Sequence, residues 1–154
     1  MKKGNFKLAV ILLSLAVFFA YCGKGNTTSS EATGFLTISI KEDPIVFNWN
    51  SSIEKWETLF TIVLTESGGS EMEINTVSTE AREGETVRLK HTVRFYGEWH
   101  VPANGSDECV WDYDEFNIPG KEHFDTLRVL IYAFDETGNY QELEKDFTNL
   151  SFVE

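Results

Sequence analysis

Residues 85–95 carry the pattern that most constrains the fold of this chain. Every second position from Val87 to Phe95 is apolar, apart from one histidine, and the positions between are polar or charged. The first set is Val87, Leu89, His91, Val93 and Phe95, and the second is Thr86, Arg88, Lys90, Thr92 and Arg94. Successive side chains of a β-strand point to opposite faces. The pattern therefore predicts a strand with one face on a core and the other in water, as in an antiparallel sheet.

Shorter segments of the same kind recur along the chain. They are residues 36–40, 45–49, 59–65, 72–76, 110–113, 125–134 and 140–147. Turn-forming residues such as Pro44, Gly69, Gly84 and Gly138 separate most of them, and residues 96–124 are the longest irregular stretch. No segment shows a convincing helical period. About seven strands without helices predict an all-β fold, an antiparallel β-sandwich, with a closed barrel as the second choice.

Two hairpins are expected within this pattern. The first is formed by residues 60–74, which contain LTESGGSEMEI, and the second by residues 127–147, LRVLIYAFDETGNYQELEKDF. Both resemble hairpins of bacterial immunoglobulin-like or fibronectin type III-like modules, in which an Asp-x-x-Gly-Asn turn commonly joins the last two strands. Here that turn is Asp135, Gly138 and Asn139. The resemblance implies an immunoglobulin-like or fibronectin type III-like sandwich, and it implies little about activity.

The N-terminal segment predicts export. Three lysines, Lys2, Lys3 and Lys7, precede a run from Leu8 to Tyr21 in which only Ser14 is polar. A helix needs about 20 residues to cross ~30 Å of hydrocarbon, so this run is too short to span a membrane. A basic start followed by a short apolar run is typical of a signal peptide. We therefore assign residues 1–21 as a signal peptide.

The residues around Cys22 resemble a bacterial lipobox. The sequence is Phe19-Ala20-Tyr21-Cys22, in which Tyr21 departs from the small residue usual before the cysteine. The resemblance implies that Cys22 carries acyl chains, palmitate among them, and anchors the protein to a membrane. Gly23, in place of an aspartate, favours the outer membrane over the inner one, on its periplasmic or surface face. The alternative is plain secretion, with Cys22 removed along with the signal peptide.

Composition divides the rest of the chain. Residues 22–34 are small and polar after the cysteine and predict a flexible linker, and residues 35–154 are expected to form a single domain.

Removing the three signal-peptide lysines from 13 basic residues leaves 10 against 25 acidic ones, a formal charge near −15. Such a surface repels phosphate backbones, which argues against nucleic-acid binding. If Cys22 is lipidated, Cys109 has no disulfide partner within the chain.

Residues 95–124 are the predicted binding region. The candidate ligand-binding residues are Trp99, Trp111, Tyr113 and Phe116. Aromatic rings on the end loops of a sandwich can stack on a sugar or a peptide. The alternative is that these rings form a lid over one end of the core.

Metal and catalytic sites are weakly indicated. The calcium candidates are Asp107, Asp112, Asp114 and Asp135, without a dense D-x-D-x-D-G loop. His91, His100 and His123 lack zinc-ligand spacing, and no cofactor is expected. We predict a non-enzymatic interaction or structural module of the cell envelope, whose partner is an envelope protein or glycan. The alternative is an exported hydrolase, or a carbohydrate-binding module, that uses the acidic and aromatic residues 95–124.

Overall fold

The structure is a computed structural model that describes residues 35–112 and 118–154. The predicted signal peptide, Cys22 and the predicted linker lie outside these residues. The described part of the chain is all-β and contains no helix, as the alternation predicts. It also contains no helix that is long and apolar enough to cross a membrane.

The described residues form eleven strands. They are β1 (Leu36–Ile40), β2 (Ile45–Asn50), β3 (Lys55–Thr58), β4 (Phe60–Glu66), β5 (Met72–Glu83), β6 (Thr86–Val101), β7 (Ser106–Trp111), β8 (Ile118–Pro119), β9 (Thr126–Asp135), β10 (Tyr140–Phe147) and β11 (Leu150–Val153). The number exceeds the expected seven mainly because of three short strands that the sequence pattern did not predict, β3, β8 and β11, which have four, two and four residues.

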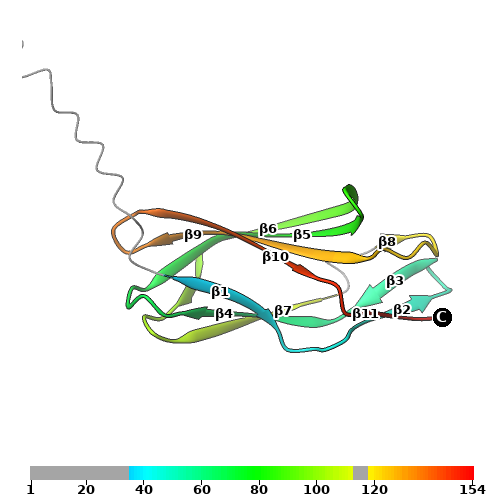
Figure 1. The fold of residues 1–154 in the computed structure, drawn as a ribbon, viewed down its shortest axis with the longest axis horizontal. Coiled ribbons are helices and arrows are strands. Elements are labelled where there is room, and N and C mark those ends of the chain that lie inside the picture. Colours follow the sequence, from blue (N-terminus) through cyan, green and yellow to red (C-terminus); the bar gives the residue numbers. More distant parts are fainter. Residues whose placement is uncertain (1–34, 113–117) are drawn as a thin grey trace, which may run out of the picture. The chain divides into compact units, whose positions relative to one another are not determined.

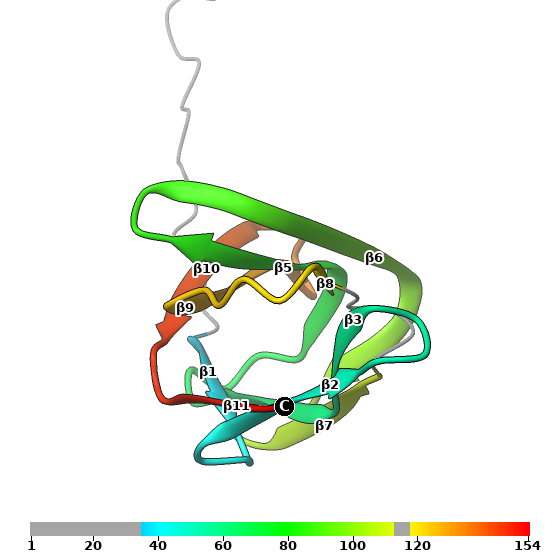
Figure 2. The same cartoon turned by 90° about the vertical axis from the view of Figure 1, so that its right-hand side faces the viewer.

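The strands form a sandwich-like arrangement of sheets. One layer is a four-stranded antiparallel sheet in the order β10-β9-β5-β6, and it faces a three-stranded antiparallel sheet in the order β1-β4-β7 (Figures 1 and 2). A third sheet, in the order β11-β2-β3-β8, lies at one end of the domain. Within it, β11 pairs in parallel with β2, so the last two strands of the chain belong to different sheets.

One of the two expected hairpins is wrong. Strand β4 pairs with β1 and β7, whereas β5 pairs with β6 and β9, so the turn after Glu66 carries the chain from one sheet to the other. Each of the two strands buries one apolar face whether they pair as a hairpin or lie in opposite layers. The apolar alternation therefore does not distinguish the two arrangements. The second hairpin is confirmed, because β9 and β10 pair from Phe134↔Tyr140 to Leu127↔Phe147.

The irregular character expected for residues 96–124 is also wrong in part. Strand β6 continues to Val101, and β7 covers residues 106–111. Tyr96 and Gly97 have positive φ angles of 48° and 80°, where the β5–β6 register shifts. This bulge interrupts the strand pattern in the sequence, but Trp99 and Val101 beyond it again point into the core.

The core lies between the layers and follows the predicted alternation. Its largest fully buried side chains are Trp56, Trp111, Phe47, Phe60, Ile45, Ile62, Leu64, Met72, Ile74, Leu127 and Ile131. Leu89, Val93 and Phe95 pack against this core and are partly buried. Val87 was expected to face inward but is 43% exposed, because it lies near the tip of the β5–β6 hairpin.

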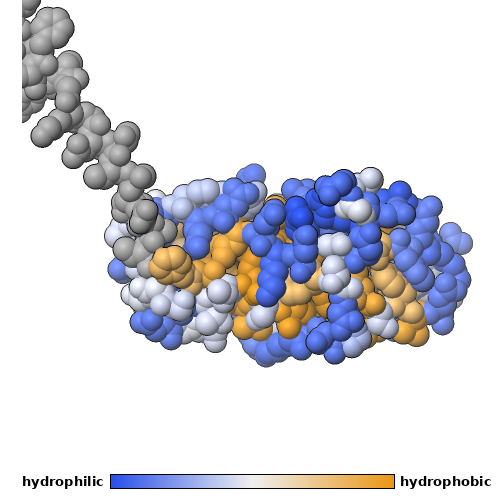
Figure 3. Space-filling view, viewed as in Figure 1, coloured by the Kyte–Doolittle hydropathy of each residue, from blue (hydrophilic) through white to orange (hydrophobic). Residues whose placement is uncertain are grey.

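A lysine bridges the two layers on the side of the domain where β1 and β10 run. Figure 3 shows a band of apolar residues on this side, with hydrophilic residues around it. Lys145 occupies an inward position of β10, opposite Val129. Its ammonium group donates a hydrogen bond to the Ile38 carbonyl of β1 over 2.8 Å and lies 5.4 Å from the centre of the Phe147 ring.

Candidate functional site

Two of the predicted aromatic residues, Trp99 and Trp111, belong to the core. Trp99 is 6% exposed, packs with its ring centre 5.0 Å from that of Phe95, and donates from its indole nitrogen to Asp107 over 3.0 Å. Trp111 has no exposed surface, and its ring lies edge-on to that of His91. Neither indole presents an open face to a ligand, which agrees with the alternative that these rings close the core.

The other two aromatic candidates, Tyr113 and Phe116, lie outside the described residues, as does Asp114. Asp112 is exposed just after β7. The structure therefore does not bring the four aromatic candidates together within the residues that it describes.

Two of the calcium candidates are engaged by the chain itself. Asp107 accepts hydrogen bonds from the Trp99 indole and, over 2.9 Å, from the Glu108 backbone amide. Asp135 accepts three hydrogen bonds at one carboxylate oxygen, from the amide and hydroxyl of Thr137 and the amide of Asn139. The hydrogen bonds from Thr137 and Asn139 hold the pKa of Asp135 well below its usual range. Both carboxylates therefore have structural partners.

The histidines do not form a metal centre with other described residues. His91 points inward from β6, His100 lies on the outer face of the same strand, and His123 lies between β8 and β9. Among the described residues, no three His, Cys, Asp or Glu side chains are grouped as a metal ion would require.

A different aromatic group is partly accessible, and we call it the distal cluster: Trp49, Trp56, Lys121, His123 and Phe152. The Trp49 and Trp56 rings meet edge to face, with centres 5.3 Å apart, and the Lys121 ammonium lies 5.4 Å from the centre of the Trp49 ring. His123 stacks on Phe152 at 4.4 Å with an angle of 10° between the rings, and its centre is 5.4 Å from that of Trp56.

Three distant parts of the chain position this cluster. Trp49 and Trp56 are directly opposite each other in the β2–β3 hairpin, so their side chains share one face. The hairpin turn is held by Asn50, which donates to Glu57 over 2.8 Å and accepts from the Ser52 amide over 3.0 Å. Phe152 arrives on β11, where the parallel pairing sets it beside Phe47.

The cluster has a buried base and an accessible rim. Trp56 is fully buried, Trp49 is partly exposed, and Lys121 and His123 are exposed. A shallow recess of about 220 Å³ adjoins His123 and is lined also by Arg88, Ile118, Glu122 and Phe124. Rings beside cationic and carboxylate groups can stack on a flat partner surface and hydrogen-bond to its edge.

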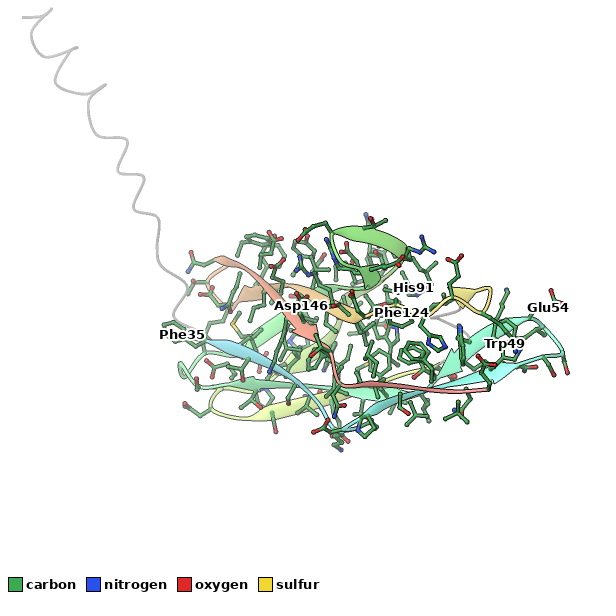
Figure 4. All side chains as sticks on the ribbon, turned by 45° about the vertical axis from the view of Figure 1, so that its right-hand side comes forward. Phe35, Trp49, Glu54, His91, Phe124 and Asp146 are labelled. Carbon is green, nitrogen blue, oxygen red and sulfur yellow. The ribbon has the colours of Figure 1, made fainter. Side chains whose placement is uncertain are left out.

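The distal cluster lies at the end of the described domain opposite to Phe35. Figure 4 shows Phe35 at one end and Trp49 with Glu54 at the other. Ile53, in the turn next to Glu54, is 47% exposed, and Glu54 has a positive φ of 54°. The predicted linker joins the domain at Phe35, so the cluster is at the end away from that junction.

The sequence prediction missed the two tryptophans of this cluster. Lys121 and His123 fall inside the predicted region 95–124, but Trp49 was assigned only to a strand. A signal was present, because Trp49 and Trp56 flank the turn-forming Asn50-Ser51-Ser52. Two tryptophans on either side of a short turn can form a cross-strand pair.

Comparisons with known proteins concern the fold alone. No protein-family model matches the chain, and no curated protein matches it. An X-ray structure of Northeast Structural Genomics Consortium target SoR45 is similar with a TM-score of 0.54 at 12% identity, covering 77% of this chain and 87% of that one. A crystal structure of a Bordetella pertussis protein described as ApaA has a TM-score of 0.49 at 15% identity, covering 78% and 96% of the two chains. The likeness to SoR45 indicates a shared fold.

Proposed function

We propose that this protein is an exported lipoprotein, held at a bacterial membrane through acylated Cys22, and that its β-sandwich is a non-catalytic interaction module of the cell envelope. The support for export and anchoring is the sequence from Met1 to Cys22, with its basic start, short apolar run and lipobox-like end. The opposition of sheets β10-β9-β5-β6 and β1-β4-β7 supports an immunoglobulin-like or fibronectin type III-like module.

The observation that carries the interaction role is the position of the distal cluster. It combines a partly exposed Trp49 with the exposed side chains of Lys121 and His123 at the end opposite Phe35. Eleven linker residues, 23–33, reach about 35–40 Å when fully extended. A domain tethered in this way presents its far end to partners in the envelope.

The partner that suits this end is an envelope protein or a glycan. Indole and imidazole rings stack on the apolar faces of sugars and of aromatic side chains, while Lys121 and Glu122 supply polar contacts. The exposed rings are the reason to keep a carbohydrate-binding module as the second candidate.

Anchoring is tested by the intact mass of the processed protein. Acylated Cys22 at the N-terminus, lost together with membrane association in a Cys22→Ser variant, is the expected result. A mature chain that begins after Cys22 and carries no lipid would refute the anchor.

Binding is tested with a glycan array and with crosslinking to envelope proteins. We expect Trp49→Ala to abolish the binding that the parent protein shows. Tyr96→Ala is the matched control, because Tyr96 is 77% exposed on β6, outside the distal cluster. Binding that Tyr96→Ala removes and Trp49→Ala preserves would contradict this site.

A further inference from the structure

The outer face of the four-stranded sheet has a different chemistry on each strand. The side chains that point away from the core are mostly acidic on β10, large on β9, small or acidic on β5, and mostly basic on β6. Alternate residues of these strands lie in rows that run straight across the sheet. Two of these rows combine charges of opposite sign.

The first row is Glu142, Tyr132, Thr76 and Arg94, from β10 to β6. Glu142 and Arg94 are exposed at its two ends. Glu142 accepts a hydrogen bond from the Tyr140 hydroxyl over 3.1 Å. Among the described residues, neither Glu142 nor Arg94 forms an ion pair, so the row has an unpaired charge of opposite sign at each end.

The second row is Asp146, Arg128, Glu80 and Lys90, so its charges alternate in sign. Arg128 binds both carboxylate oxygens of Asp146, over 2.6 and 2.8 Å. Glu80 accepts a hydrogen bond from Lys90 over 2.9 Å. When such an alternating row of four charges is turned end for end and laid against an identical row, each charge lies opposite one of the other sign.

A two-fold axis parallel to the strands performs this reversal for the whole face. It places β10 of one copy opposite β6 of the other, and β9 opposite β5, while each row meets its own counterpart. Glu142 then faces Arg94 of the second copy, and Asp146 faces Lys90. We propose that this outer face binds the same face of a second copy of the chain, as a symmetric dimer.

Side-chain size fits the same arrangement. Strand β9 presents Tyr132, which would meet the smaller Thr76 on β5 of the second copy, while Leu130 and Ser78 in the next row are largely buried within each copy. Large side chains facing small ones let two sheets approach to the usual distance of about 10 Å. The net negative charge opposes association at long range, but salt screens that repulsion beyond roughly 8–10 Å. If both copies are tethered to one membrane, the tether raises their local concentration, which also favours dimer formation.

The test uses two charge reversals that complement each other. The full chain is expressed with its own signal, and the processed protein is studied by sedimentation velocity. Glu142→Lys places a lysine opposite Arg94, and Arg94→Glu places a glutamate opposite Glu142, so each variant alone has two like-charge contacts. We expect the parent protein to form dimers and each variant alone to dissociate at least about tenfold more readily.

Mixing the two variants is the decisive step. In the mixed dimer, the introduced lysine of one copy faces the introduced glutamate of the other, and the remaining contact pairs the native Glu142 with the native Arg94, so dimers are expected to return. A parent protein that stays monomeric at high concentration would overturn the proposal. So would variants whose mixture fails to dimerise although each keeps the melting temperature of the parent. Acylation does not account for the differences between parent, variants and mixture, because all of them have the same N-terminal sequence, and the mass of the mature chain reports on Cys22 separately.

Discussion

The Glu66 carboxylate accepts a hydrogen bond from the backbone amide of Asn104 over 2.7 Å, joining the end of β4 to the loop after β6. The same carboxylate accepts hydrogen bonds from the amides of Phe35, Gly68 and Gly69. Burial raises the pKa of Glu66, but the backbone amides outweigh this effect and the net shift is downward. One acidic side chain therefore fastens three separate segments at the end of the domain where the predicted linker joins.

We expect Glu66→Gln to destabilise the domain by about 2–3 kcal/mol at pH 7, because a charged acceptor of several hydrogen bonds is lost. A lowered pKa in the folded state gives stability that is present above the unfolded value of about 4.3 and lost as the pH falls below it. Urea unfolding at pH 7 and at about pH 3 should thus show a smaller difference between variant and parent at the lower pH. Glu136→Gln, at an exposed site, is the control. An equal loss in both variants would contradict the role of Glu66.

Trp111→Ala should destabilise the fold by about 3–5 kcal/mol, because it empties a large fully buried site. Trp49→Ala should cost much less, since Trp49 is partly exposed at the rim of the distal cluster. Denaturant unfolding of the two variants measures the difference. A stability loss as large in Trp49→Ala as in Trp111→Ala would show that Trp49 is a core residue and not an accessible one.

Glu80→Ala should destabilise the domain by about 2–3 kcal/mol, because it removes the largely buried carboxylate that both Arg82 and Lys90 contact. Glu80 is only 7% exposed, whereas Glu144, two strands away, has an exposed side chain. Glu144→Ala is therefore expected to change stability by less than about 1 kcal/mol. Thermal unfolding at low protein concentration compares the two variants. Equal effects would mean that the burial of Glu80 contributes nothing.

Calcium chelation is expected to leave the melting temperature unchanged. The Asp107 and Asp135 carboxylates already accept hydrogen bonds from the chain. Melting curves with added calcium and with EGTA provide the measurement. A clear upward shift with calcium that EGTA reverses would show that a calcium site exists after all, and Asp135→Asn would then show whether it involves the 135–139 turn.

The strands were predictable because their alternation has a direct physical cause. One buried face and one wet face require apolar residues at every second position, as in β1, β4 and β9. Pairing was less predictable, because the β4–β5 link satisfies the same pattern as a hairpin while Glu66 holds the turn between two sheets. The local sequence does not show whether β4 and β5 form a hairpin or lie in different sheets, because the Glu66 partners Phe35 and Asn104 are 31 and 38 residues away.

The candidate site was predictable only in part. An aromatic group near one end of a sandwich was expected, and Lys121 and His123 of the predicted region do belong to such a group. Sequence alone does not distinguish an aromatic residue of the core from one at the rim, because Trp99, Trp111 and Trp49 all occupy inward strand positions. The difference arises from the surroundings: Trp111 is fully buried with its ring against that of His91, whereas Trp49 lies beside the turn between β2 and β3 and stays partly exposed.

The bridge from Lys145 to the Ile38 carbonyl has a consequence for behaviour at high concentration. β1 and β10 are the outermost strands of their sheets on that side, and unpaired strand edges are where foreign strands add and aggregates begin. A charged amine that lies across the gap and occupies an outward carbonyl makes this edge a poor template. The protein is thus protected against polymerising along this side of the sandwich, where Figure 3 shows apolar residues at the surface.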